Sequence, residues 1–178
     1  LEPLRALATP VMDTVAPIQY PEIYRLTDHQ SMPHSAAIRS MFAHDLSDET
    51  LDAVLDAVET ASSPMSIVQF RGMGGAVGSV APAATAFSYR DQAFFVAIIG
   101  LWMNEDPNAA THTDWTLTLW EQIRGEGDGV YVNFLEDEGA GRVRDAYPPA
   151  TYERLAEIKR RYDPENIFRF NQNISPKR

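Results

Sequence analysis

The chain has 178 residues, of which 44% are hydrophobic and 22% charged, a composition typical of one globular domain with a buried core. Lys and Arg number 15 against 25 Asp and Glu, so the net charge of −10 argues against binding to a nucleic-acid backbone. The absence of cysteine excludes disulfides, thiolate metal sites and thiol nucleophiles. No apolar run approaches ~18 residues, so we expect a soluble chain without a membrane partner. Its start, Leu1-Glu2-Pro3, leads us to expect that it begins within a longer protein.

Prolines divide the N-terminal region into short pieces. Residues 4–7 and 21–26 are predicted to be helical, and Pro10, Pro17 and Pro21 would break any longer helix. We therefore interpret this region as a connection.

The next stretch alternates between strand and helix. Residues 36–42 have strand character, and Ser47 is predicted to cap a helix. That helix is expected to cover a sheet, because apolar residues recur at spacings of three and four on one face: Leu51, Val54, Leu55 and Val58.

Two further strands follow. Residues 65–71 alternate, and residues 93–102 are apolar almost without interruption, as in a strand buried on both faces. The glycine-rich run 72–78 has the composition of a dinucleotide-binding loop, but such a loop opens a helix, and here Pro82 follows. We interpret the run as a loop that borders a substrate cavity.

The remaining elements complete an α+β pattern. A helix is predicted to begin at Asp106 and Pro107, residues 130–134 to form a strand, and a long helix to surround Tyr152, Leu155, Ile158 and Tyr162. The sequence thus predicts four strands with helices between and after them. We expect an α+β fold with a mostly antiparallel sheet, covered by helices on one face, and a C-terminal extension.

Within the predicted strand 130–134, alternation separates Tyr131 and Asn133 from the apolar residues. One interpretation is an ordinary sheet with a solvated outer face. The other is that Tyr131 and Asn133 face a cofactor or substrate.

The C-terminal tail has the densest signature. Asp163 and Pro164 are predicted to start one short helical turn, as N-cap and first helical residue. Beyond it, three amides stand in a row, at Asn171, Gln172 and Asn173, beside apolar residues. Buried amides require hydrogen-bond partners, which a polar ligand with many edges would supply.

The tail, residues 162–174, closely resembles the C-terminal motif of the berberine bridge enzyme family of flavin-dependent oxidases. The resemblance begins in the region of residues 3–5, continues through residues 85–90, Trp102, 129–134 and 154–155 to the tail, and so covers nearly the whole chain. It implies a substrate-binding α+β domain in residues 1–128, packed as one unit with a C-terminal segment, residues 129–178. It also implies that FAD is held mostly by an N-terminal domain of the same protein that is absent from this chain, so that the fragment alone is inactive.

The resemblance implies oxidation of a small-molecule substrate by hydride transfer from a C–O or C–N centre to flavin N5. Tyr131 is then the candidate base, while the cofactor-binding candidates are Asn133, Asn171, Gln172 and Asn173. The substrate-binding candidates are Arg90, Ala97 and Ile99. Two positions depart from the family pattern, since Tyr89 stands where histidine is frequent and Ala97 where plant relatives carry Glu or Gln. Because free tyrosine has a pKa near 10, a base at Tyr131 needs a stabilising cation or donor, from the missing domain or from Arg90.

Other polar clusters have simpler interpretations. His29 and His34 lack a spaced set of carboxylates, so no metal site is expected, and His44 and His112 are interpreted as surface or capping residues. Residues 136–138 are interpreted as a solvated acidic turn, and residues 159–161 as the wet side of the last helix. The alternative function that remains open is a stand-alone module that binds a ligand or a partner protein without redox activity.

Overall fold

The computed structural model describes residues 2–7, 9, 11–26, 33–170 and 172–176. It divides into two compact units, residues 1–33 and 34–178. The first unit contains helix α1 (Glu2–Arg5) and a 3-10 helix (Tyr20–Leu26), at the two places where the sequence predicts short helical pieces. Among the described helices, none is both long and apolar enough to cross a membrane.

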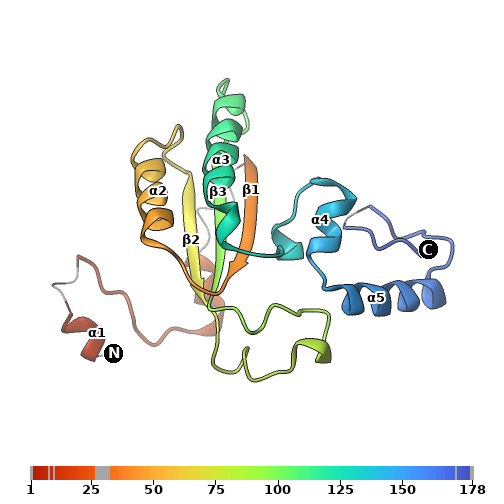
Figure 1. The fold of residues 1–178 in the computed structure, drawn as a ribbon. Coiled ribbons are helices and arrows are strands. Elements are labelled where there is room, and N and C mark those ends of the chain that lie inside the picture. The colour runs from red at the N-terminus through yellow and green to blue at the C-terminus, as the bar shows by residue number, and fades with distance from the viewer. Residues whose placement is uncertain (1, 8, 10, 27–32, 171, 177–178) are drawn as a thin grey trace. The chain divides into compact units, whose positions relative to one another are not determined.

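The second unit is built on a three-stranded antiparallel sheet (Figure 1). Its strands are β1 (His34–Ala43), β2 (Ile67–Gly72) and β3 (Phe94–Met103), in the order β1-β3-β2. The central strand, β3, is the one whose sequence is apolar almost throughout, and most of its residues are buried. This agrees with the expectation for a strand covered on both faces.

Helices α2 (Asp48–Glu59) and α3 (Ala109–Ile123) cover one face of this sheet. The Oγ atom of Ser47 accepts a hydrogen bond from the Thr50 amide at 3.2 Å, which confirms the predicted N-cap of α2. The main core lies between sheet and helices and contains Met41, Val96, Ile98, Val54, Leu119 and Ile123. The antiparallel sheet with helices on one face confirms the predicted fold class.

The opposite face of the sheet carries aromatic side chains. Phe42 and Phe95 are buried there with Ala97, and rings from two loops pack against them. We call this set the aromatic face: Phe42, Phe87, Tyr89, Phe95, Tyr131 and Phe134. The side chains packed on this face come from loops and from a short 3-10 helix, so we regard this face as the place where the fold can present side chains to a ligand.

The prediction of a strand at residues 130–134 is wrong. This segment contains a 3-10 helix (Val132–Phe134), and the chain touches the sheet only through an isolated bridge between Phe42 and Asp128. Gly129, with φ of 65°, turns the backbone away from that bridge before a ladder can form. Consequently Val130 packs with Leu135 and Val143, whereas Phe134 joins the aromatic face.

Two helices form the C-terminal part, α4 (Gly139–Asp145), which the sequence did not predict, and α5 (Pro149–Tyr162), which it did. Asp163 does not start a helix, contrary to the prediction. It ends α5, and its carboxylate accepts hydrogen bonds from the amides of Ile167 at 2.7 Å and Phe168 at 3.1 Å. Lys159 also donates to this carboxylate, so Lys159 is not on the wet side of α5 as expected. The pKa of Asp163 is lowered, first by the hydrogen bond from Lys159 and then by the two backbone amides.

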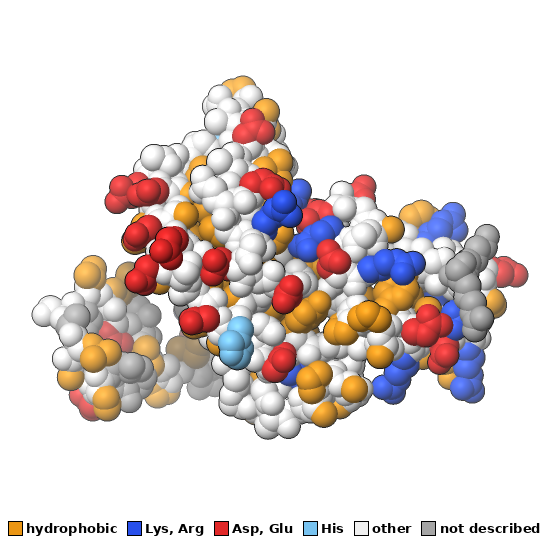
Figure 2. Space-filling model, in the orientation of Figure 1, with side chains coloured by type: hydrophobic (Ala, Val, Ile, Leu, Met, Phe, Trp, Pro, Cys, Tyr) orange, Lys and Arg blue, Asp and Glu red, His pale blue; other side chains and the backbone are white. Residues whose placement is uncertain are grey.

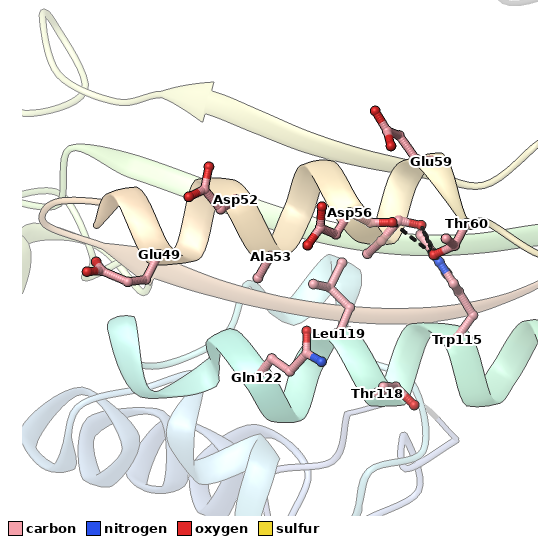
Figure 3. Close-up of a pocket in the computed structure, with 11 residues that line it drawn as sticks. Glu49, Asp52, Ala53, Asp56, Glu59, Thr60, Trp115, Thr118, Leu119 and Gln122 are labelled. Carbon is pink, nitrogen blue, oxygen red and sulfur yellow. Dashed lines mark hydrogen bonds between the residues drawn. The ribbon is translucent and has the colours of Figure 1, made fainter.

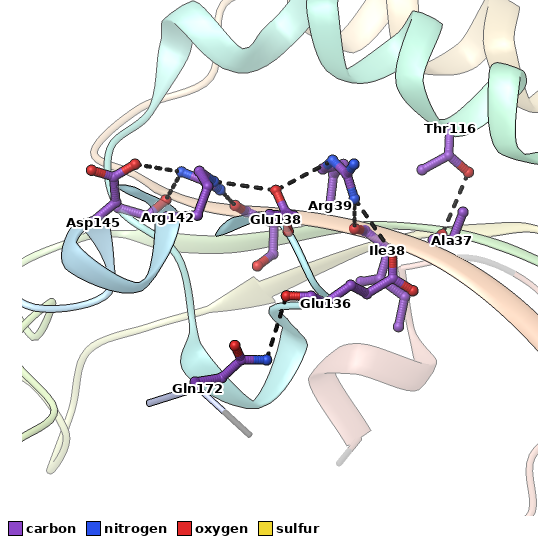
Figure 4. Close-up of polar contacts among 11 residues, drawn as sticks. Ala37, Ile38, Arg39, Thr116, Glu136, Glu138, Arg142, Asp145 and Gln172 are labelled. Atoms are coloured by element: carbon purple, nitrogen blue, oxygen red, sulfur yellow. Dashed lines mark hydrogen bonds and ion pairs between the residues drawn. The ribbon is translucent and has the colours of Figure 1, made fainter. Parts of the chain in front are cut away.

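An ion-pair network joins strand β1 to the C-terminal part (Figure 4). The carboxylate of Glu138 lies 3.3 Å from Arg39 Nε and 3.2 Å from Arg142 Nε, and Arg142 also pairs with Asp145 at 3.2 Å. The Glu138 side chain is only 8% exposed, so the expectation of a solvated turn is wrong for this residue. Two cations on either side offset the cost of burying the carboxylate.

His112 is also buried, at 2% exposure, rather than on the surface. Its Nδ1 lies 2.7 Å from Ser62 Oγ, and its Nε2 lies 3.2 Å from Asp106 Oδ2. These contacts join the start of α3 to the loop after α2. His112 is therefore part of the packing between helix and loop.

Candidate functional site

A cavity of about 320 Å³ opens on the aromatic face. Its polar lining consists of Arg71, Arg90 and Tyr131. Its apolar lining comes from the sheet and from the loop between β2 and β3: Phe42, Phe95, Met73, Val77 and Phe87. Met73 and Val77 belong to the glycine-rich run 72–78, so this run borders the cavity, as expected for a loop beside a substrate cavity.

Aromatic rings hold Tyr131 in the cavity wall. Its ring meets those of Phe87 and Phe95 edge-on, with centroids 5.8 and 5.7 Å away, and stacks on Phe134 at 5.8 Å. The Nδ2 atom of Asn133 donates a hydrogen bond to the Tyr131 hydroxyl at 2.8 Å. The two residues that sequence alternation put on one side are thus together, although a 3-10 turn and not a strand brings them there.

Tyr89 is not part of the cavity lining but packs against Phe42, which is. Its ring stacks on Phe42 at 4.8 Å with an interplanar angle of 8°, and its hydroxyl donates to the Asp145 carbonyl at 2.5 Å. Burial raises the pKa of Tyr89, and the nearby Asp128 and Asp145 carboxylates raise it further. A neutral phenol whose proton is already donated in a hydrogen bond is suited to holding the cavity wall in place rather than to proton transfer.

Arg90 lines the cavity, and its donors hold the surrounding loop. Its guanidinium donates to the carbonyls of Phe87 and Val77, each at 3.1 Å, and to Thr85 Oγ1 at 2.9 Å. It also lies over the Phe87 ring, 5.1 Å from the centroid. Arg90 therefore stabilises the loop that borders the cavity.

Arg71 is the cavity residue that sequence reasoning missed. Its guanidinium lies over the rings of Phe134 at 5.0 Å and Phe95 at 5.5 Å, and Nη2 donates to Gln69 Oε1 at 2.7 Å. The alternation of residues 65–71 was the available signal, because it separates Gln69 and Arg71 from the residues that face the helices.

Ala97 and Ile99 lie on β3 beside the aromatic rings. Ala97 is fully buried and Ile99 is half-buried, and both pack with the aromatic face. Ser40 is the register partner of Ala97 on β1, and its buried Oγ has no hydrogen-bond partner among the described residues. At this position, then, the side chains of Ala97 and Ser40 offer no acid or base.

One amide candidate of the tail, Gln172, contacts the segment that follows Tyr131. Gln172 Nε2 donates to the Leu135 carbonyl and, at 3.4 Å, to the Glu136 carbonyl (Figure 4). Asn173 keeps a buried Oδ1 that has no partner in the described part of the chain. Asn171 lies outside the described residues.

A larger hollow lies elsewhere. It is an open groove of about 890 Å³ between α2 and α3, where Trp115 Nε1 donates to the Ala57 carbonyl at 2.8 Å (Figure 3). Acidic side chains of α2 border it and dominate that side of the surface (Figure 2). Within the described ranges, no group of His, Asp or Glu could hold a metal ion. The groove lacks a tyrosine or basic residue, so we place the candidate site on the aromatic face.

Comparisons with known proteins find similar sequences among FAD-linked oxidoreductases. Residues 130–175, which include Tyr131 and the tail, match the family model described as "Berberine and berberine like". The whole chain is 31% identical over 187 residues to the FAD-linked oxidoreductase YvdP of Bacillus subtilis (strain 168), and the match covers 41% of that protein.

Two further matches name substrates. The chain is 28% identical to monolignol oxidoreductase AtBBE-like 13 of Arabidopsis thaliana over 139 residues, which cover 71% of this chain and 26% of that protein. It is similar to the crystal structure of glycopeptide hexose oxidase DBV29 complexed with teicoplanin, with a TM-score of 0.70 and 27% identity, over 80% of this chain and 32% of the other. The chain thus spans less than half the length of each of these relatives.

Proposed function

Because this chain belongs to the berberine bridge enzyme-like family, we propose that it forms the substrate-binding part of an FAD-dependent oxidoreductase. The proposed reaction oxidises a C–O or C–N centre, with a hydride leaving carbon and a proton leaving the attached oxygen or nitrogen. The names of two relatives favour a hydroxyl-bearing substrate, since monolignols and hexoses are both alcohols. The observation that carries the proposal is the aromatic-lined cavity with Tyr131 in its wall.

The residues of this chain fit one side of a flavin. When bound, FAD supplies the acceptor for the hydride. The aromatic face offers flat apolar surface, and the orphaned Oδ1 of Asn173 is a buried acceptor that an N–H of a heterocycle would satisfy. We propose that Asn133, Asn171 and Asn173 contact the ring, and that Gln172 fixes the loop beside them. Most of FAD would be held by an N-terminal domain of the same protein, so we expect the chain alone to be inactive.

Tyr131 is the proposed base. The surrounding rings fix its orientation in the cavity wall. The amide N–H of Asn133, directed at the phenol oxygen, stabilises negative charge on that oxygen. Tyr131 would accept the substrate proton while Asn133 keeps the phenol oxygen in place.

The test is the substitution Tyr131→Phe in the full-length protein, with flavin reduction followed by rapid mixing. A monolignol, a hexose and a benzylic alcohol serve as substrates. Loss of a general base slows the chemical step by about 100-fold or more, whereas substrate affinity should change far less. Tyr152→Phe is the matched control, because Tyr152 lies on α5 and pairs with Arg144 away from the cavity. Unchanged reduction by Tyr131→Phe would reject the role of base.

The same preparation tests the alternative of a module without redox activity. A full-length protein that carries no flavin after purification, and that cannot be reduced by any of these alcohols when FAD is added, would support that alternative. A yellow protein that is bleached by one of them would support the oxidoreductase.

A further inference from the structure

The cavity on the aromatic face contains two guanidinium groups and no carboxylate. We propose that it selects substrates that carry a carboxylate group, and that Arg71 binds this group. The redox step of such a substrate rests on the function proposed above, but the binding preference can be measured without it.

The arginines of the cavity differ in their partners from the arginines that join β1 to α4. The chain has a net charge of −10, and the partly buried arginines of β1 and α4, Arg39 and Arg142, share the carboxylate of Glu138, whereas Arg71 on β2 is exposed and Arg90 is partly buried. Neither Arg71 nor Arg90 has an acidic side chain within 4.0 Å among the described residues. Two guanidinium groups without an acidic partner in the described part of the chain give the cavity a local positive potential that attracts an anion, and because Arg71 is exposed, this attraction should weaken as salt is added.

The two arginines have different amounts of hydrogen-bonding capacity left. In Arg90, Nε and both terminal nitrogens donate hydrogen bonds to the surrounding loop, so this residue contributes positive charge to the cavity but few free N–H groups. In Arg71, only Nη2 donates a hydrogen bond to another described residue, Gln69. A guanidinium has five N–H donors in a fixed fork, so Arg71 retains enough for a bidentate bond to a carboxylate.

Arg71 is also held in place before a ligand arrives. Its guanidinium lies between hydrogen-bonded Gln69 and the rings of Phe95 and Phe134. Stacking of this kind orients the planar group and reduces the entropy lost on binding. Phe95 and Phe134 also contact Tyr131, so the anion site and the proposed base share one wall.

The size and lining of the cavity define the rest of the ligand. A volume of about 320 Å³ is near the lower limit of the roughly 300–1,000 Å³ usual for ligand pockets. Aromatic walls favour a flat apolar body. The chemical class that fits is therefore an aromatic alcohol with a carboxylate, of which para-hydroxymethylbenzoate is a simple example.

Calorimetry on the full-length protein tests the preference with para-hydroxymethylbenzoate and its neutral amide as probes. We expect the carboxylate to bind at least about tenfold more tightly than the amide, equivalent to about 1.4 kcal/mol, and to bind less tightly as salt is added. Arg71→Met should remove this difference and leave the affinity for the amide nearly unchanged. Arg161→Met is the matched control, because Arg161 lies over an exposed tyrosine, Tyr162, on α5 and outside the cavity.

Three results would overturn the proposal: no preference for the carboxylate in the unmodified protein, an equal loss of both probes in Arg71→Met, or an equal effect of Arg161→Met. Because binding itself requires no turnover, a protein that binds the carboxylate through Arg71 but never reduces flavin would contradict only the proposed function. Reduction of flavin by the neutral amide as readily as by the carboxylate would contradict only the inference about Arg71.

Discussion

Glu138 joins the segment that carries Tyr131 to the sheet, so its replacement by alanine should be costly. The carboxylate lies between Arg39 and Arg142, and the three side chains are 8%, 19% and 22% exposed. Breaking a buried ion pair by removing one partner costs roughly 3–5 kcal/mol. Arg39 keeps Glu136 at 3.4 Å and Arg142 keeps Asp145, so we expect the lower end of that range, a loss of about 3 kcal/mol in the free energy of unfolding.

Urea unfolding followed by circular dichroism measures this loss, provided that the slope of the transition stays unchanged. Glu153→Ala is the control, because Glu153 pairs with Arg160 at 3.2 Å but is 58% exposed. Exposed pairs of this kind contribute about 0.5 kcal/mol or less. If Glu138→Ala were no more destabilising than Glu153→Ala, the ion-pair network would not hold the C-terminal part to β1, and the reasoning would be refuted.

Two further predictions concern the backbone and the tail. Gly129→Ala should destabilise the protein by about 3 kcal/mol, because a Cβ at this position, with φ of 65°, would lie 2.1 Å from the Tyr89 ring. Gly75→Ala is the control and should cost only about 1 kcal/mol, because Gly75 has a φ of 53° but open space around it. Equal losses of stability in thermal unfolding would argue against the contact with Tyr89. The lowered pKa of Asp163 means that its stabilising contribution is complete above the unfolded pKa of about 4 and is lost as pH falls further. The stability difference between the unmodified protein and Asp163→Asn should therefore be constant near neutral pH and shrink below about pH 4, and a difference that grows on acidification would contradict this.

Local patterns in the sequence predicted the elements of the sheet and its helical cover. The N-cap at Ser47, the alternation in β2 and the apolar run of β3 each depend on residues close in sequence. The segment at residues 130–134 has the same alternation but is not a strand, because Gly129 turns it across the sheet. Alternation describes which side chains share a side, but a strand also needs an edge with which to pair.

The composition of the candidate site was harder to predict from the sequence, because it depends on contacts between residues far apart in the chain. Tyr131, Arg90 and Ala97 could be proposed from the sequence through a family resemblance, and the tertiary structure places the first two in one cavity with Ala97 in the aromatic packing beside it. Local alternation separates Arg71 from the residues of β2 that face the helices, but it does not indicate a cavity, because the cavity role of Arg71 comes from Phe95 and Phe134, which lie 24 and 63 positions later.

The sequence by itself therefore indicated the three strands of the sheet, the helices α2, α3 and α5, the side chains available for chemistry and the family, because short-range periodicity and the tail motif can be read without coordinates. Only the tertiary structure decided which charges are compensated. Glu138 became a buried counter-ion and Arg71 a cavity cation because each is surrounded by residues that folding brings from elsewhere in the chain. The electrostatic character of a side chain depends on its neighbours in space, and for both residues those neighbours include groups far away in the sequence.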